Sequence, residues 1–69
     1  MLLIQMKKMT TINELTGWAK DKAKEYPNCR AQVFEFVSLC EDEIEQGGSE
    51  SHEVQLAYND ICDLVGIDE

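Results

Sequence analysis

The chain has 69 residues, enough for one domain, and a domain of this size buries only about 60% of the surface that its unfolded form exposes. Six basic and three acidic side chains give residues 1–30 a formal charge of +3, whereas residues 31–69 carry eleven carboxylates and no base. The net charge of −8 argues against direct nucleic-acid binding, which depends mainly on lysine and arginine.

Residues 1–9 are expected to form a flexible or weakly ordered extension before a single helical domain over 10–69. Their short apolar run precedes Lys7 and Lys8, the reverse of a secretory signal, and no segment is long enough to span a bilayer. Cys29, Cys40 and Cys62 are an odd set without a CxxC pair, which fits a reducing compartment. These features together predict a cytoplasmic protein.

The first predicted helix covers residues 11–25. It opens with Thr11-Ile12-Asn13-Glu14, a pattern in which the threonine and glutamate side chains each accept a hydrogen bond from the other's backbone N–H. Gly17 weakens this helix by about 1 kcal/mol relative to alanine. The apolar positions step by three or four residues along one face, which consists of Ile12, Leu15, Ala19, Ala23 and Tyr26.

The second predicted helix covers residues 28–46. Pro27 separates it from the first helix, because a proline and the residue before it resist helical geometry, and Asn28 is expected to cap the new start. The apolar residues of this segment fit within an arc of about 100°, as a core-facing helix requires. They are Cys29, Val33, Phe36, Val37, Cys40 and Ile44.

The third predicted helix covers residues 49–65. Gly47, Gly48 and Ser49 combine a helix-ending glycine with a capping serine before it, and Gly66 ends it, with Ile67 expected to fold back on the last turn. Its apolar face has a similar arc and consists of Val54, Ala57, Tyr58, Ile61, Leu64 and Val65.

Three amphipathic helices with short links predict an all-α fold. The arrangement is either an up-down-up three-helix bundle or a helical hairpin completed by dimerisation. Trp18, Phe34 and Leu39 lie about 100° to 120° from the centres of the apolar faces of their helices. A three-helix bundle can cover the side chains on one side of an apolar face more easily than those on both sides. Those of the three residues that stay uncovered are candidate contacts for a dimer or another partner.

One pattern suggests an enzyme, namely Asp42-x-x-Glu45 followed by Asp60-x-x-Asp63. Two helical carboxylate pairs can face each other and hold Mg²⁺ for phosphate chemistry, and all-helical nucleotide pyrophosphohydrolases use an arrangement of this general kind. The helical period turns Asp42 and Asp63 about 160° to 180° away from the buried faces, however, and so toward water. A Mg-dependent nucleotide phosphohydrolase is therefore a second alternative, and no catalytic residue, metal ligand or cofactor is predicted.

The lone histidine and the first cysteine are weak candidates for chemistry. His52 lies between Glu50 and Glu53 at a helix start, where the positive end of the helix dipole disfavours an imidazolium, and we interpret it as a surface or capping residue. Cys29 has Arg30 beside it, but no base and orienting partner can be named for a nucleophile.

The leading hypothesis is a small acidic helical module that binds a basic protein surface, steered by long-range electrostatics. Its size and acidity are similar to those of inhibitor or accessory proteins from phages and other mobile elements, and its carboxylates can mimic a nucleic-acid backbone. The alternative is a self-associating structural protein. The candidate partner-binding residues are Trp18, Phe34, Leu39, Glu41, Asp42, Glu43 and Glu45.

Overall fold

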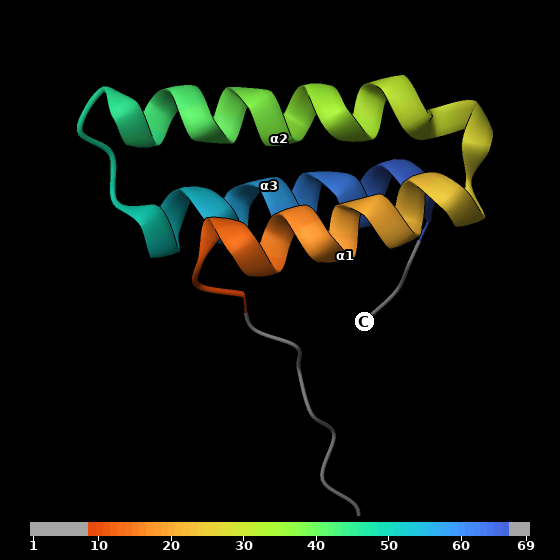
Figure 1. Ribbon diagram of the computed structural model, residues 1–69, viewed down its shortest axis with the longest axis horizontal. Coiled ribbons are helices and arrows are strands. Elements are labelled where there is room, and N and C mark those ends of the chain that lie inside the picture. The colour runs from red at the N-terminus through yellow and green to blue at the C-terminus, as the bar shows by residue number, and fades with distance from the viewer. Residues whose placement is uncertain (1–8, 67–69) are drawn as a thin grey trace, which may run out of the picture.

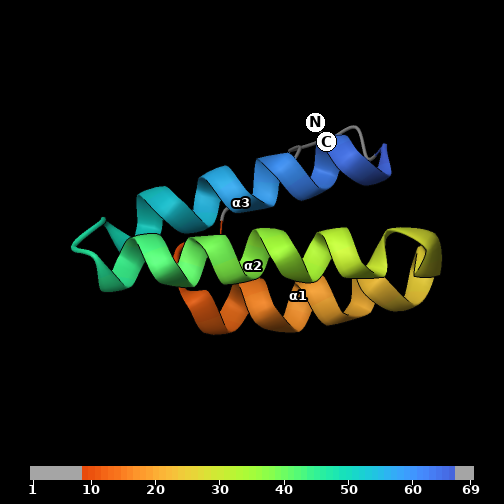
Figure 2. The ribbon, with the colours of Figure 1, turned by 90° about the horizontal axis from the view of Figure 1, so that it is seen from above.

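The computed structural model describes residues 9–66, which form three α-helices and one short 3-10 turn. The helices are α1 (Ile12–Glu25), α2 (Arg30–Glu45) and α3 (Glu50–Val65), and the turn η1 is Pro27–Cys29. The helices run up, down and up, and α2 packs against both α1 and α3 (Figure 1, Figure 2). The predicted all-α class is confirmed for this part of the chain. None of its helices combines the length and the apolar character needed to cross a bilayer.

The start of α1 is held by side chains from its own first turn and from the start of α3. Thr11 Oγ1 accepts a hydrogen bond from Glu14 N–H at 3.2 Å, and Glu14 Oε1 accepts one from Thr11 N–H at 3.3 Å, so the predicted capping box is present. Glu50, the first residue of α3, accepts a hydrogen bond from Ile12 N–H at 2.9 Å. This carboxylate therefore ties the start of α3 to the start of α1, where the helix dipole favours negative charge.

The junction between α1 and α2 is a tight turn. Cys29 N–H donates to the Tyr26 carbonyl oxygen at 2.8 Å, and α2 begins at Arg30 without a side-chain cap. Asn28 thus does not cap α2 as expected, because it lies inside the 3-10 turn. Pro27 suits the first position of that turn, since its missing N–H would have no partner there.

The loop between α2 and α3 requires both of its glycines. Gly47 N–H donates to the Ile44 carbonyl at 3.1 Å and Gly48 N–H to the Glu43 carbonyl at 2.9 Å, the two bonds of a Schellman ending. Gly47 has a φ of 106°, which favours glycine. A Cβ at Gly48 would lie 2.8 Å from the Glu43 carbonyl oxygen, so a side chain is excluded there by the backbone itself.

A serine cap and a glycine stop delimit α3. Ser49 Oγ accepts a hydrogen bond from His52 N–H at 3.5 Å, and the His52 side chain is exposed. Gly66 has a left-handed φ of 79°, and its N–H donates to the Cys62 carbonyl oxygen. The predicted contact of Ile67 with the last turn lies outside the described residues.

The core lies between the predicted apolar faces of the three helices. Leu15, Val33, Val54 and Ile61 are its largest fully buried side chains. Met9, which the sequence analysis assigned to the extension, is only 3% exposed and packs into the same core. The other buried members of this cluster are Ala19, Val37, Cys40, Ala57, Tyr58 and Cys62.

Replacing Gly17 with alanine should raise the free energy of unfolding by about 1 kcal/mol, the difference in helix propensity between the two residues. Gly17 lies inside α1, and a Cβ there would meet no neighbouring atom within 4 Å. Urea denaturation followed by circular dichroism measures the effect. Gly48→Ala is the control and should destabilise the protein, because its Cβ would meet the Glu43 carbonyl. An unchanged or lower midpoint for Gly17→Ala would contradict the open surroundings of Gly17.

Candidate functional site

Two large apolar side chains stand out on the described surface, and both line the same groove. Leu39 on α2 is 52% exposed and Leu56 on α3 is 46% exposed. The groove between these two helices has a volume of about 170 Å³ and is also lined by Phe36, Cys40 and Ala57. Exposed apolar side chains that cluster in this way are typical of contact sites for other molecules.

Three carboxylates line the same groove. Glu43 comes from α2, and Glu53 and Asp60 come from α3. None of the basic side chains among residues 9–66 lines it. We call this surface, defined by Leu39, Leu56 and these three carboxylates, the acidic groove. Its apolar contacts and its negative charge together favour a partner that is both apolar and cationic.

The pKa of Cys40, a buried residue that lines the acidic groove, is shifted by these surroundings. Burial raises the pKa of its thiol, and the negative charges of Glu53, Glu41 and Glu50 raise the pKa further. The thiol is therefore protonated at neutral pH, and it is a weak nucleophile in the folded protein.

Alkylation of the native protein at neutral pH should modify Cys29 first, since it is half-buried whereas Cys40 and Cys62 are buried. Peptide mapping by mass spectrometry measures the three rates, and labelling in urea supplies the unprotected reference. Equal native rates at Cys29 and Cys40 would contradict the structure.

Because the folded-state pKa of Cys40 is raised, this thiol's contribution to stability is present below its ordinary pKa and is lost as the pH rises through the folded-state value.

Trp18, predicted as a partner anchor, contacts α3 of the same molecule. Its ring packs against Tyr58 of α3 with ring centroids 4.6 Å apart and planes inclined at 49°. The Lys22 amino group lies 5.9 Å from the centroid of the Trp18 ring and also pairs with Glu25 at 3.1 Å. The half-buried indole thus joins α1 to α3, and less of its ring surface is exposed to a binding partner.

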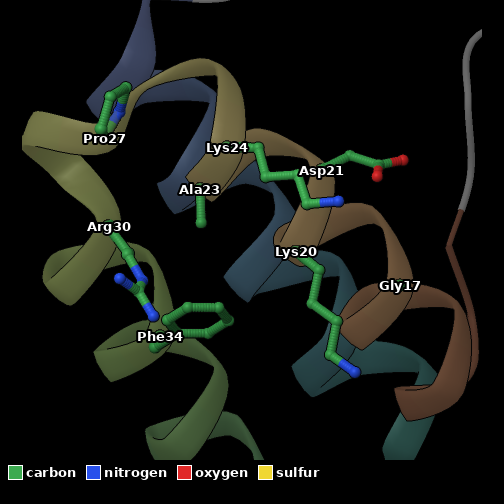
Figure 3. A pocket seen from close by; sticks show the side chains of 8 residues that line it. All are labelled: Gly17, Lys20, Asp21, Ala23, Lys24, Pro27, Arg30 and Phe34. Carbon is green, nitrogen blue, oxygen red and sulfur yellow. The ribbon is translucent and has the colours of Figure 1, made fainter.

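Phe34 and Leu39 lie on different sides of α2. Phe34 lines a cavity between α1 and α2 together with Lys20, Lys24 and Arg30 (Figure 3). Leu39 lines the acidic groove between α2 and α3. The two predicted anchors therefore face surfaces of opposite charge, and a single basic partner surface suits Leu39 alone.

The four predicted carboxylates of α2 also divide between surfaces. Glu43 lines the acidic groove, whereas Glu41 and Glu45 line a hollow of about 350 Å³ with Ile12 and Ile44. Asp42 is exposed and lines neither. This division follows from the turn of about 100° per residue in an α-helix.

The carboxylates of the phosphohydrolase alternative are dispersed. Glu45 lines the hollow beside Ile12, Asp60 lines the acidic groove, and Asp42 and Asp63 are exposed. Between residues 9 and 66, no three His, Cys, Asp or Glu side chains are arranged to hold a metal ion.

Sequence reasoning missed Leu56, Glu53 and Asp60 as members of the site. Leu56 lies outside the apolar arc of the third helix, just as Leu39 lies outside that of the second, and this angular position is the sequence signal that marks both leucines. The sequence marks Asp60 only through the Asp60-x-x-Asp63 pattern and Glu53 only as a neighbour of His52, because the approach of both carboxylates to Leu39 depends on how α3 is rotated against α2.

No protein-family model, curated protein or solved structure matches the chain. The acidic groove is the candidate functional site on its geometry, because it brings the two exposed leucines together with three carboxylates.

Proposed function

We propose that the protein is a small interaction module that binds a basic, amphipathic segment of another protein in the acidic groove. The observation that carries the proposal is the exposure of Leu39 and Leu56 in one groove that Glu43, Glu53 and Asp60 also line. By occupying the basic segment of its partner, such a module acts as an inhibitor or an accessory subunit without any catalytic step.

The recognition mode that suits this site is a helix in a groove. α2 and α3 run in opposite directions along the groove (Figure 1, Figure 2). An amphipathic helix presents apolar side chains at intervals of three or four residues, and these would pack on Leu39 and Leu56. Lysines or arginines beside that apolar face would then lie near Glu43, Glu53 and Asp60, where opposite charges favour the complex.

A second copy of the chain is a poorer occupant of the groove. Two copies meeting face to face would bring the carboxylates Glu43, Glu53 and Asp60 of one copy against the same carboxylates of the other, and like charges oppose such a contact. The exposed leucines also favour a partner segment over pure mimicry of a nucleic-acid backbone, which would need only the carboxylates. The wider acidic surface adds long-range attraction toward a basic partner.

The binding test uses a fluorescent synthetic helix as the probe. The peptide carries leucines at every third or fourth position and lysines on both sides of that apolar face. Fluorescence anisotropy should show micromolar binding to the full chain that weakens as salt is added, because the charges are screened. Two control peptides, one with serine for leucine and one with glutamate for lysine, should not bind. Absence of binding by the basic amphipathic peptide would overturn the proposal.

Matched charge variants separate the groove from general electrostatics. The triple variant Glu43→Gln, Glu53→Gln, Asp60→Asn should bind the peptide about tenfold more weakly, since three pairs of roughly 0.5 kcal/mol sum to about 1.5 kcal/mol. A control variant changes the net charge equally at exposed carboxylates that do not line the groove, with the substitutions Glu35→Gln, Asp42→Asn and Asp63→Asn.

The control variant should retain most of the affinity for the peptide. An equal loss of peptide affinity in both triple variants would contradict specific binding in the acidic groove. Sedimentation of the free protein gives the other decisive outcome: a dimer that dissociates on Leu39→Ala would assign the groove to self-association instead.

A further inference from the structure

A second hollow surface lies on the other side of α2, between α1 and α2. Its volume is about 620 Å³, within the range of roughly 300 to 1,000 Å³ that is typical of sites for small organic ligands. Lys20, Asp21 and Lys24 line it from α1, and Arg30 and Phe34 line it from α2 (Figure 3). Gly17 also lines it and contributes no side chain, which keeps that part of the α1 wall open.

The charge of this cavity is opposite to that of the whole chain. Residues 9–66 include four basic side chains, and Lys20, Lys24 and Arg30 line the cavity. Within the described residues these three form no salt bridge, whereas the fourth, Lys22, pairs with Glu25 at 3.1 Å. The cavity also includes one carboxylate, Asp21, whose side chain, like those of Lys20 and Lys24, extends from α1 to the side away from Arg30 and Phe34 in Figure 3. Three cations against one carboxylate give a locally positive field in a protein of net charge −8.

The α2 wall of the cavity provides a surface for a planar group. The Phe34 ring lies beside the Arg30 guanidinium on this wall (Figure 3). Phenylalanine rings and guanidinium planes both stack on planar aromatic groups, and the guanidinium also binds phosphate and carboxylate through paired hydrogen bonds. The wall therefore combines stacking with recognition of an anion.

We infer that this cavity, which we call the basic cavity, binds a small organic anion with a planar aromatic body. The aromatic body stacks on Phe34, and the anionic group lies among Lys20, Lys24 and Arg30. Phosphate esters such as nucleotides and aromatic carboxylates share this chemistry. The site is separate from the acidic groove on the α3 side of α2, so it does not depend on the proposed function.

Titration of the full ¹⁵N-labelled chain, followed by amide chemical shifts, tests this inference with two probes: adenosine monophosphate and naphthoate. One probe or both should bind saturably at millimolar concentration or below, with the largest shifts over residues 17–24 and 30–34. Tighter binding of the former would indicate a phosphate ester as the ligand, and tighter binding of the latter a carboxylate. Adenosine alone and inorganic phosphate alone should each bind at least about tenfold more weakly, because each lacks one half of the recognised chemistry.

Variants of equal charge change supply the control. Lys24→Gln and Arg30→Gln should each weaken binding about threefold or more, while Lys22→Gln should leave the affinity within about twofold because Lys22 does not line the cavity. Phe34→Leu keeps an apolar side chain but should weaken binding about fivefold through lost stacking. Circular dichroism checks the fold of each variant, and the lysine and arginine variants decide the question if Phe34→Leu is unfolded.

Three outcomes would overturn the inference. The first is no saturable shift with either probe. The second is an equal loss of affinity in Lys22→Gln and Lys24→Gln, which would indicate general charge attraction alone. The third is binding of adenosine or of phosphate as tight as that of adenosine monophosphate, which would show that the anion and the ring are not recognised together.

Discussion

Replacing Leu15 with alanine should lower the free energy of unfolding by about 3 kcal/mol, within the range measured for buried leucines in other proteins. Leu15 is 0% exposed and lies in the core beside residues of α2 and α3. Alanine would remove its apolar contacts and leave a cavity that a close-packed interior fills only in part. A domain of this size has a total stability on the order of 5 kcal/mol, so this loss would leave little margin.

Urea denaturation followed by circular dichroism measures this loss, and Leu39→Ala is the matched control. The same atoms are removed there, but Leu39 is 52% exposed and the surroundings lose fewer contacts. The control should cost less than about 1 kcal/mol, because little apolar area returns to water. Equal costs at the two positions would contradict the assignment of Leu15 to the interior and Leu39 to the surface.

Binding of the basic amphipathic peptide should weaken about tenfold in Leu39→Ala and again in Leu56→Ala, as expected for apolar anchors at the centre of an interface. Each change removes one of the two exposed leucines of the acidic groove. The double variant should bind too weakly for anisotropy to detect at micromolar concentration. Because both side chains are exposed, the loss should occur without unfolding, which distinguishes it from the effect of Leu15→Ala.

Phe34→Leu is the control for this binding experiment. Phe34 lines the basic cavity and not the acidic groove, so its substitution should leave the affinity for the basic peptide unchanged. Native affinity in the Leu39→Ala and Leu56→Ala variants would show that the peptide binds elsewhere. A loss in Phe34→Leu equal to that in Leu39→Ala would point to the same conclusion.

Much of the fold could be predicted from local chemistry. The apolar faces follow from spacings of three and four residues, and Leu15, Val33 and Ile61 lie in the core as their periodicity predicts. The capping box at Thr11 and the left-handed Gly66 are local signals that act within one turn of chain. The predicted cap at Asn28 is wrong because Asn28 lies inside the 3-10 turn Pro27–Cys29, and α2 begins only at Arg30.

The site was harder to predict, because it depends on how the helices are placed against each other. Glu50 accepts a hydrogen bond from the backbone N–H of Ile12, which lies 38 positions earlier, and no local pattern in the sequence predicts this contact. Trp18 is flanked by Tyr58 only because α1 and α3 approach on that side. In the same way, the position of Leu39 around its helix places it outside the core, but the sequence does not show that Leu56 lines the same groove.

The most direct measurement of the central claim is an NMR titration of the full ¹⁵N-labelled chain with the basic amphipathic peptide. If the acidic groove is the binding site, the largest amide shifts should fall at 36–43 on α2 and 53–60 on α3, with small changes over 17–24. Shifts centred on the basic cavity, or spread evenly over all three helices, would contradict the account.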